Sequence, residues 1–387
     1  MINSLIKLAP LESAPKHCSR IAISHSKPYL GDDLEWASRQ VALNGYIGSG
    51  EQVRLFETEM AGLHEAAGGV ATNSGTAALH LALMALQIGP ADEVIIPSYV
   101  CTAVMNAVCY VGATPVLADL DELSFNLDPT DVNKRLTDRT KAIIIPHLFG
   151  NPADIHSLKK LGIPIIEDCA QALGATIDEQ LVGSFGDLAV FSFYATKVIT
   201  TGYGGMVISK RADWLEMMRD LRDYDEKDNY LPRYNYQMSD LAAAIGRRQL
   251  RRLPGFLDRR AELAAFYSDQ LTGIADIEPP FTQQGSCHYR YVIRSSRRQA
   301  LEEIFFRAGI EAKRPVHNPL HHFIGGEYPR TESVHRTALS IPLYPALSET
   351  EAMQVMDAIR LGSASHKFME DASISHRSKQ VVATVKV

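Results

Sequence analysis

Short apolar runs alternate with helical patterns between about residue 69 and residue 250 of this 387-residue chain. Turn residues bound each run, and helical periodicity separates many of them. Runs this apolar are typical of strands buried on both faces, as in a parallel sheet covered by helices. The pattern predicts an α/β fold, with a mostly parallel sheet sandwiched by helices. The runs are residues 70–72, 93–96, 114–117, 142–145, 163–166, 189–191 and 206–208.

The pattern changes at both ends of the chain. An alternating strand pattern at 288–294 and helical patterns at 299–308 and 348–361 predict a smaller α+β domain after the sheet. The tail is polar and lacks periodicity, so we expect it to be mobile. The predicted organisation is an N-terminal arm at 1–31, a large domain at 32–253, a small C-terminal domain at 254–362 and a tail at 363–387.

Composition excludes several classes of protein. Apolar residues make up 46% and charged residues 22%, which is ordinary for a globular chain and excludes a disordered or fibrous one. The net charge of −6 comes without a basic stripe, so we expect no nucleic-acid partner. No apolar run is long enough for a membrane span and no signal peptide is evident, so we expect no membrane partner. Five scattered cysteines argue against a disulfide framework or a zinc site and favour a cytoplasmic location.

Ligands of α/β sheets bind beyond the carboxyl ends of the strands, so the residues after each strand matter most. The first run is followed by Ser74-Gly75-Thr76 and then a helix. Backbone N–H groups, a helix dipole and two hydroxyls together are typical of a phosphate site. A simple N-cap with a glycine turn is the alternative, and it is more common for this motif alone.

Two further strand ends carry ionisable groups. Asp168 follows the run at 163–166, where a carboxylate could cap a helix, bind a metal or pair with a protonated ring nitrogen. Lys197 follows the run at 189–191 and precedes a glycine-rich turn at 200–205. Most lysines are solvated surface charges. A lysine between two buried strands would instead lose solvation, which favours the neutral, nucleophilic amine.

These three positions together suit pyridoxal 5′-phosphate (PLP). The phosphate needs N–H and hydroxyl donors, the pyridinium nitrogen needs a carboxylate, and the aldehyde needs a lysine amine. Each requirement is met after a different predicted strand, by Gly75 and Thr76, by Asp168 and by Lys197.

Five blocks of sequence carry a family resemblance that extends from about residue 26 to residue 361. Because these blocks occur together and in the same order, the chain resembles the DegT/DnrJ/StrS-type PLP-dependent sugar aminotransferases, of the fold-type-I aspartate aminotransferase superfamily. That resemblance implies that the large domain binds PLP. The blocks are TNSGTAALHLAL (72–83), EDCAQALGA (167–175), FSFYATKVITTGYGGMV (191–207), NYQMSDLAAAIG (235–246) and LSIPLYPALSE (339–349).

The resemblance also implies roles for single residues. Lys197 corresponds to the lysine that forms the Schiff base, and Asp168 to the partner of the pyridinium nitrogen; these two are the predicted catalytic residues. Asn235 corresponds to an asparagine that reaches the phosphate from the neighbouring subunit, so the resemblance implies a homodimer with shared active sites. The remaining cofactor-binding positions are Gly75, Thr76 and Ser192 at the phosphate, Gln171 on the ring-hydroxyl side, and Cys101 over the ring.

At three positions the chain departs from the family pattern. Cys101 stands where the family usually has an aromatic residue over the ring, and Tyr99 could replace it only if the loop shifts. Tyr203 replaces the acid of a Gly-Glu-Gly-Gly turn. Tyr194 stands where nearer relatives often have histidine.

The segment RPVHNPLHHF (314–323) resembles a substrate-binding loop of the family's small domain. Arg314 suits a phosphate or carboxylate, because its planar guanidinium matches either group. The predicted substrate-contacting residues are Arg314, His317, His321 and Tyr203. A polar surface loop is an equal alternative for this segment. A metal site at His317, His321 and His322 is not predicted, because two prolines break the spacing and no carboxylate or cysteine completes the set.

The predicted function is a PLP-dependent aminotransferase of amino-sugar and polysaccharide biosynthesis. It would convert a nucleotide-linked keto-sugar to an amino-sugar, with glutamate as the expected amino donor. Three alternatives remain open: a PLP-dependent nucleotide-sugar dehydratase, an aminotransferase for a cyclitol or aromatic-precursor ketone, and a non-enzymatic regulator. Dehydratases of the family commonly have histidine in place of the lysine, so Lys197 argues against the first alternative.

Overall fold

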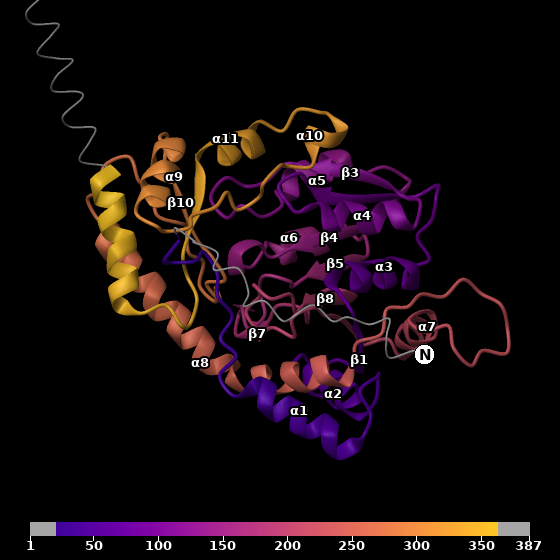
Figure 1. Ribbon diagram of the computed structural model, residues 1–387. Helices are drawn as coiled ribbons and strands as arrows, with labels where there is room; N and C mark the ends of the chain where they lie inside the picture. Colours follow the sequence, from indigo (N-terminus) through magenta and orange to yellow (C-terminus); the bar gives the residue numbers. More distant parts are fainter. Residues whose placement is uncertain (1–20, 363–387) are drawn as a thin grey trace, which may run out of the picture.

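The computed structural model describes residues 21–362 of the chain (Figure 1). The first 20 residues of the predicted N-terminal arm and the predicted tail at 363–387 lie outside the described residues. Among the described helices, none combines the length and the hydropathy that crossing a membrane requires.

A seven-stranded sheet forms the centre of the fold, in the order β1-β9-β8-β5-β4-β2-β3. Every neighbouring pair is parallel except those of β9, which runs antiparallel to both β1 and β8. The predicted α/β architecture with a mostly parallel sheet is therefore confirmed. The strands are β1 Gly68–Thr72, β2 Glu93–Pro97, β3 Thr114–Ala118, β4 Thr140–Pro146, β5 Ile165–Asp168, β8 Leu188–Ser192 and β9 Gly205–Ser209.

Helices cover both faces of the sheet. Consecutive residues of a strand point to opposite faces, so Ile144 packs in one apolar core and its neighbours Ile143 and Ile145 pack in another. One face lies against α3 (Gly75–Ala85), α4 (Thr102–Tyr110) and α7 (Ala212–Leu221). The other lies against α2 (Glu51–Leu63), α5 (Pro129–Arg135), α6 (Ile155–Lys159) and the first part of α8 (Asp240–Leu271), and α1 (Asp33–Asn44) packs on α8.

A single 32-residue helix, α8, continues through Pro254, where the sequence pattern alone predicts two helices, at 239–253 and 255–271. Proline removes one backbone hydrogen bond and usually breaks a helix, at a cost of about 3 kcal/mol. The cost is offset here because both halves are packed: Leu253 and Phe256 are buried in the core beneath the sheet, and Leu263 and Tyr267 in the core of the C-terminal part. The boundary that we propose between the two domains, at residues 253 and 254, thus lies inside α8.

The C-terminal part packs around the second half of α8 (Figure 1). Its two strands, β10 and β11, pair antiparallel. The sequence patterns predicted β10, α9 and the final helix, but not α10, α11 or β11, which hold too few apolar positions to show a period. The elements here are β10 Tyr291–Arg294, α9 Arg298–Arg307, α10 His321–Ile324, α11 Pro329–Thr337, β11 Ala338–Ile341 and a helix at 349–362; a small hairpin, β6 Thr176–Ile177 and β7 Gln180–Leu181, and a 3-10 turn, Leu148–Gly150, belong to the sheet domain.

Candidate active site

Four strands of the sheet end at one cavity of about 280 Å³. Since parallel strands place their carboxyl ends on the same edge, residues far apart in the sequence meet there. The lining comes from the loops after β1, β2, β5 and β8 and from the turn before β9. The lining residues are Ser74, Gly75, Thr76, Leu79, Cys101, Ala103, Val104, Asp168, Ala170, Val190, Ser192, Tyr194, Lys197, Tyr203 and Gly204.

The first turn of α3 forms one wall of this cavity. Ser74 caps the helix, because its hydroxyl accepts a hydrogen bond from the N–H of Ala77 at 3.1 Å. The N–H groups of Gly75 and Thr76 make no hydrogen bond within residues 21–362, so both can donate to a ligand. A Cβ atom on Gly75 would lie 2.9 Å from the Cβ of Ser192, so only glycine lets the serine approach this closely. The N-cap and the phosphate interpretations of this motif are thus compatible.

Asp168 ends β5 and lines the cavity, with 7% of its surface exposed. Its Oδ1 atom accepts a hydrogen bond from the N–H of Ala170 at 3.0 Å, and its Oδ2 atom has no partner within the described residues. Burial raises the pKa of this carboxyl group, although the Ala170 N–H and the charge of Lys197 act in the opposite direction. A buried carboxyl group with one open oxygen fits a cationic partner such as a protonated ring nitrogen.

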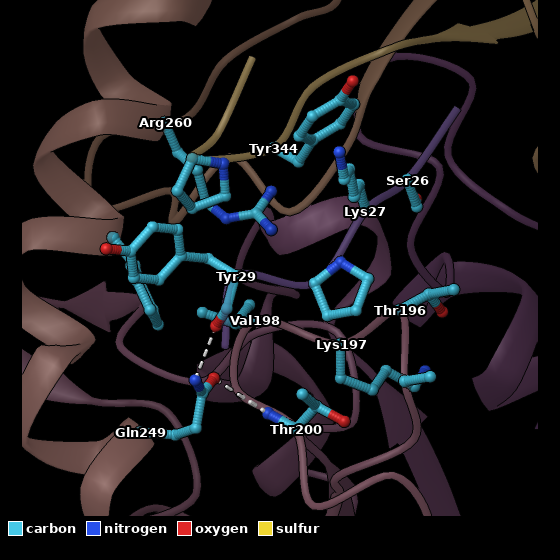
Figure 2. Close-up of a pocket in the computed structure, with 14 residues that line it drawn as sticks. Ser26, Lys27, Tyr29, Thr196, Lys197, Val198, Thr200, Gln249, Arg260 and Tyr344 are labelled. Carbon is cyan, nitrogen blue, oxygen red and sulfur yellow. Dashed lines mark hydrogen bonds between the residues drawn. The ribbon is translucent and has the colours of Figure 1, made fainter. Parts of the chain in front are cut away.

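Lys197 follows β8 in a turn, where its N–H donates to the carbonyl of Tyr194 at 2.9 Å. The lysine is partly buried and lines the main cavity. It also lines a second, much smaller cavity of about 10 Å³ on its other side, shown in Figure 2. There the loop that carries Lys197 is fixed by Gln249 of α8, whose side chain bonds the N–H of Thr200 and the carbonyl of Tyr29.

Cys101 lies at the N-cap of α4 and lines the main cavity, as its predicted place over a cofactor ring requires. Tyr99 does not offer an alternative. Its ring is completely buried and stacks on Phe125 at a centroid distance of 6.4 Å, in the apolar core behind the loop.

Two tyrosines stand among the lining residues with large exposed surfaces. The rings of Tyr194 and Tyr203 meet edge to face, with centroids 5.3 Å apart. Tyr203 is 72% exposed and Tyr194 43% exposed, so an aromatic pair borders the opening of the cavity. Two of the three positions at which the chain departs from the family pattern thus lie next to each other.

Gln171 and Asn235 are not among the lining residues of this cavity. The Oε1 atom of Gln171 accepts a hydrogen bond from the N–H of Phe149 at 3.0 Å. Asn235 has an exposed side chain, and its carbonyl accepts a hydrogen bond from the Nδ2 atom of Asn73 at 3.0 Å. Asn235 is therefore beside the loop between β1 and α3 of its own chain, while its side chain is exposed.

The predicted substrate-contacting residues of the small domain also lie off the lining of the cavity. Arg314 is 3.9 Å from the carboxylate of Glu302, and His317 is exposed. His321 is buried, and its Nδ1 atom lies 2.6 Å from the hydroxyl of Ser98. Their contacts with a substrate remain predictions.

The sequence-based statement that no carboxylate completes the histidine set is wrong. Glu332 of α11 lies with its Oε1 atom 2.7 Å from Nε2 of His321, and the Nε2 atom of His322 bonds the same oxygen. Glu332 is ten residues beyond the segment, so spacing within the segment could not reveal it. The three side chains are joined by direct hydrogen bonds, which tie α10 to α11.

Sequence reasoning missed two groups next to the cavity. His147 and Glu167 are both completely buried, and Glu167 directly precedes Asp168. Tyr289, which is 3% exposed, lies with its ring centroid 5.5 Å from the Nζ atom of Lys197. A buried glutamate in a strand could have been noticed in the sequence, but no local pattern indicates the position of Tyr289.

Comparisons with known proteins agree with this geometry. The profile of the "DegT/DnrJ/EryC1/StrS aminotransferase family" matches residues 29–360, and the chain therefore belongs to that family. It is 37% identical over 327 residues to the UDP-N-acetyl-3-dehydro-alpha-D-glucosamine 3-aminotransferase of Acidithiobacillus ferrooxidans, covering 80% of this chain and 88% of that one. It is 36% identical to the dTDP-3-amino-3,4,6-trideoxy-alpha-D-glucose transaminase of Streptomyces venezuelae, covering 86% and 92% of the two chains.

Solved structures resemble the whole described fold. The PLP form of the putative sugar aminotransferase Spr1654 from Streptococcus pneumoniae superposes with a TM-score of 0.83 at 27% identity, over 88% of this chain and 98% of that one. The protein is thus an aminotransferase of a family whose members are PLP enzymes.

Proposed function

We propose that this enzyme binds PLP in the main cavity and transfers an amino group to a nucleotide-linked keto-sugar. One observation carries the proposal: the free N–H groups at the start of α3, the open oxygen of Asp168 and the side chain of Lys197 all face one cavity. The substrate class is supported by the relatives named above, which act on UDP- and dTDP-linked sugars.

Each proposed binding group meets a different part of the cofactor. Gly75, Thr76 and Ser192 would hold the phosphate, and Cys101 would lie against the ring. When bound, PLP supplies an electron-accepting ring for amino-group transfer. The Oδ2 atom of Asp168 would hold a proton on the ring nitrogen, because a buried carboxylate favours a cationic neighbour.

Lys197 would bind the cofactor through its Nζ atom and then act as an acid and base. Once released, its Nζ amine would take a proton from the amine-bearing carbon of the amino donor and, in the second half of the reaction, would deliver a proton to the carbonyl carbon of the keto-sugar. Its place in the wall of the cavity supports both tasks. Glutamate is the proposed donor, and the exposed pair of Tyr194 and Tyr203 would contact the incoming sugar.

We further propose a homodimer in which Asn235 completes the partner's phosphate site. The outward direction of its exposed side chain, away from its own cavity lining, supports this role. Arg314, His317 and His321 of the small domain are proposed to contact the substrate. The four described cysteines are free, which supports a cytoplasmic enzyme.

Two measurements test the proposed function. Borohydride reduction of the PLP-loaded enzyme, followed by peptide mass spectrometry, should find the cofactor attached to Lys197. An assay of UDP-, dTDP- and GDP-linked keto-sugars with glutamate should then yield an amino-sugar from at least one of them. Attachment to another lysine would overturn the site. Turnover of cyclitol ketones alone would overturn the substrate class.

A further inference from the structure

The ring of a buried tyrosine, Tyr289, lies close to the amine of the proposed cofactor lysine. Tyr289 lies two residues before the start of β10, and its ring centroid is 5.5 Å from Nζ of Lys197. At this distance an ammonium group is attracted to the face of an aromatic ring, more strongly when water is excluded. Only 3% of Tyr289 is exposed, so the attraction acts in a poorly solvated environment.

The main chain of Tyr289 is held from two directions. Arg260 of α8 is itself buried, and its Nη1 atom donates to the carbonyl of Tyr289 at 3.0 Å and to that of Leu343 at 3.2 Å. On the other side, a Cβ atom on Gly150 would lie 2.7 Å from the N atom of Tyr289, so the two backbones are in close contact. The ring is therefore placed by the packing of three separate segments and not by a mobile loop.

The surroundings of the phenol favour its ionised form. Burial alone would raise the pKa of Tyr289, but the charges of Lys197 and Arg290 and hydrogen bonds with Thr196 and Arg290 outweigh it and lower the pKa to about 7. The charge of Lys197 is thus one of the causes that lower the pKa of Tyr289. The other charged or titratable groups near the pair are Arg260, Cys287 and Asp168.

We propose that Tyr289 is a positioning residue for Lys197, whose ring and hydroxyl together fix the amine at the wall of the cavity. The inference rests on the proposed function, because the amine matters for catalysis only if Lys197 binds the cofactor. Tyr289 belongs to the proposed small domain. The position of that domain relative to the sheet would therefore affect the proton transfers at Nζ of Lys197.

The test measures the pKa of Lys197 in the cofactor-free enzyme. Competitive acetylation with acetic anhydride over a series of pH values, followed by peptide mass spectrometry, reports this pKa for the peptide that contains Lys197. In Tyr289→Leu the pKa of Lys197 should fall by about one unit, because the ring and its hydroxyl are both lost. In Tyr289→Phe, which keeps the ring, the fall should be smaller but measurable.

Tyr291→Phe is the matched control. Tyr291 is also buried and is two residues further along, but its hydroxyl bonds Ser268 at 2.9 Å. This variant should keep the wild-type pKa of Lys197. An unchanged pKa in Tyr289→Phe would overturn the inference, even if the leucine variant failed to fold. Failure of the proposed function is a separate result, since borohydride would then attach PLP to a different lysine.

Discussion

The Nε2 atom of His147 lies 3.0 Å from the Oε2 atom of Glu167, and both side chains are completely buried. The N–H of Ala153 donates to Nδ1 of the histidine at 2.9 Å, so the ring proton is on Nε2 and is donated to the glutamate. Backbone N–H groups of the turn before β8 donate further hydrogen bonds to this carboxylate. They belong to Gly183, Phe185 and Gly186, at 2.8, 2.8 and 2.6 Å.

Glu167→Gln should destabilise the fold at neutral pH by about 3 kcal/mol, since the NH₂ group of the glutamine would face N–H donors that a carboxylate oxygen accepts, and buried donors would lose their acceptor. Burial raises the pKa of Glu167, but the hydrogen bonds from His147 and from the backbone lower it by more. The pKa of Glu167 therefore lies below its ordinary value of 4.5. A carboxyl group whose pKa is lower in the folded state stabilises the protein at pH values above its unfolded-state pKa. This stabilisation is lost as the pH falls through the folded-state pKa. Urea unfolding should thus show a difference in unfolding free energy between Glu167→Gln and the wild type, and this difference should become smaller at acidic pH.

The control for this prediction is Glu179→Gln, which changes an exposed glutamate of the nearby β6–β7 hairpin. It should leave the unfolding free energy within about 0.5 kcal/mol of wild type. A difference for Glu167→Gln that stays constant between pH 7 and strongly acidic pH would contradict the ionised state of the glutamate.

Lys197→Ala should abolish amino-group transfer and the borohydride-stable attachment of PLP, while the fold remains. The loss should reach at least about 10²–10⁴-fold, which is the usual contribution of a general acid and base. Lys210→Ala is a suitable comparison, because Lys210 is exposed just after β9 and outside the cavity lining. Activity of Lys197→Ala close to that of Lys210→Ala would remove Lys197 from the mechanism.

Asp168→Asn should keep PLP bound but lower the rate about 10²–10³-fold, because a neutral amide cannot hold a proton on the ring nitrogen. The amide still accepts the Ala170 N–H through its oxygen, so the end of β5 should keep its shape. Steady-state rates and the absorbance of bound PLP check both halves of this prediction. A rate within a few-fold of wild type would leave Asp168 with a structural role alone.

Gly75→Ala should weaken PLP binding about tenfold, since overpacking of this kind commonly costs about 1–3 kcal/mol. The new methyl group would lie 2.9 Å from Ser192 Cβ, so one side of the phosphate site must move. Gly89→Ala is the matched control, because nothing lies within 4 Å of the position of its Cβ atom. Fluorescence titration of the cofactor-free variants with PLP measures the effect, and equal affinities would contradict it.

The sheet and the positions around it were predictable because their signals are local. Buried strands are apolar over consecutive residues, and the groups at their ends, such as Gly75, Asp168 and Lys197, follow directly in the sequence. Parallel pairing then brings these groups to one edge of the sheet.

Contacts between distant segments were not predictable from local patterns. The meeting of Tyr289 with Lys197, and of Glu332 with His321, depends on how the C-terminal part packs against the sheet. Pro254 misled the interpretation of α8 for the same reason, because buried contacts on both sides of the proline keep the helix continuous.

Asn235 of each subunit is proposed to complete the phosphate site of its partner. Mixed dimers of an Asn235→Ala chain and a Lys197→Ala chain distinguish the two possible arrangements. If Asn235 serves the partner's site, one site of the mixed dimer carries both substitutions and the other carries neither, so about half of the wild-type activity per dimer returns. If it serves its own chain, each site carries one substitution, and activity does not return.

We expect the first outcome, because two-fold symmetry places the same surface of both subunits at the interface and so completes both sites equally. The exposed side chain of Asn235 lies off its own cavity, while its carbonyl holds Asn73 beside the phosphate loop. The mixed dimers should be isolated with two different affinity tags, and Asn235→Ala alone should weaken PLP binding in the homodimer. A chain that stays monomeric and fully active at assay concentration would contradict the shared site altogether.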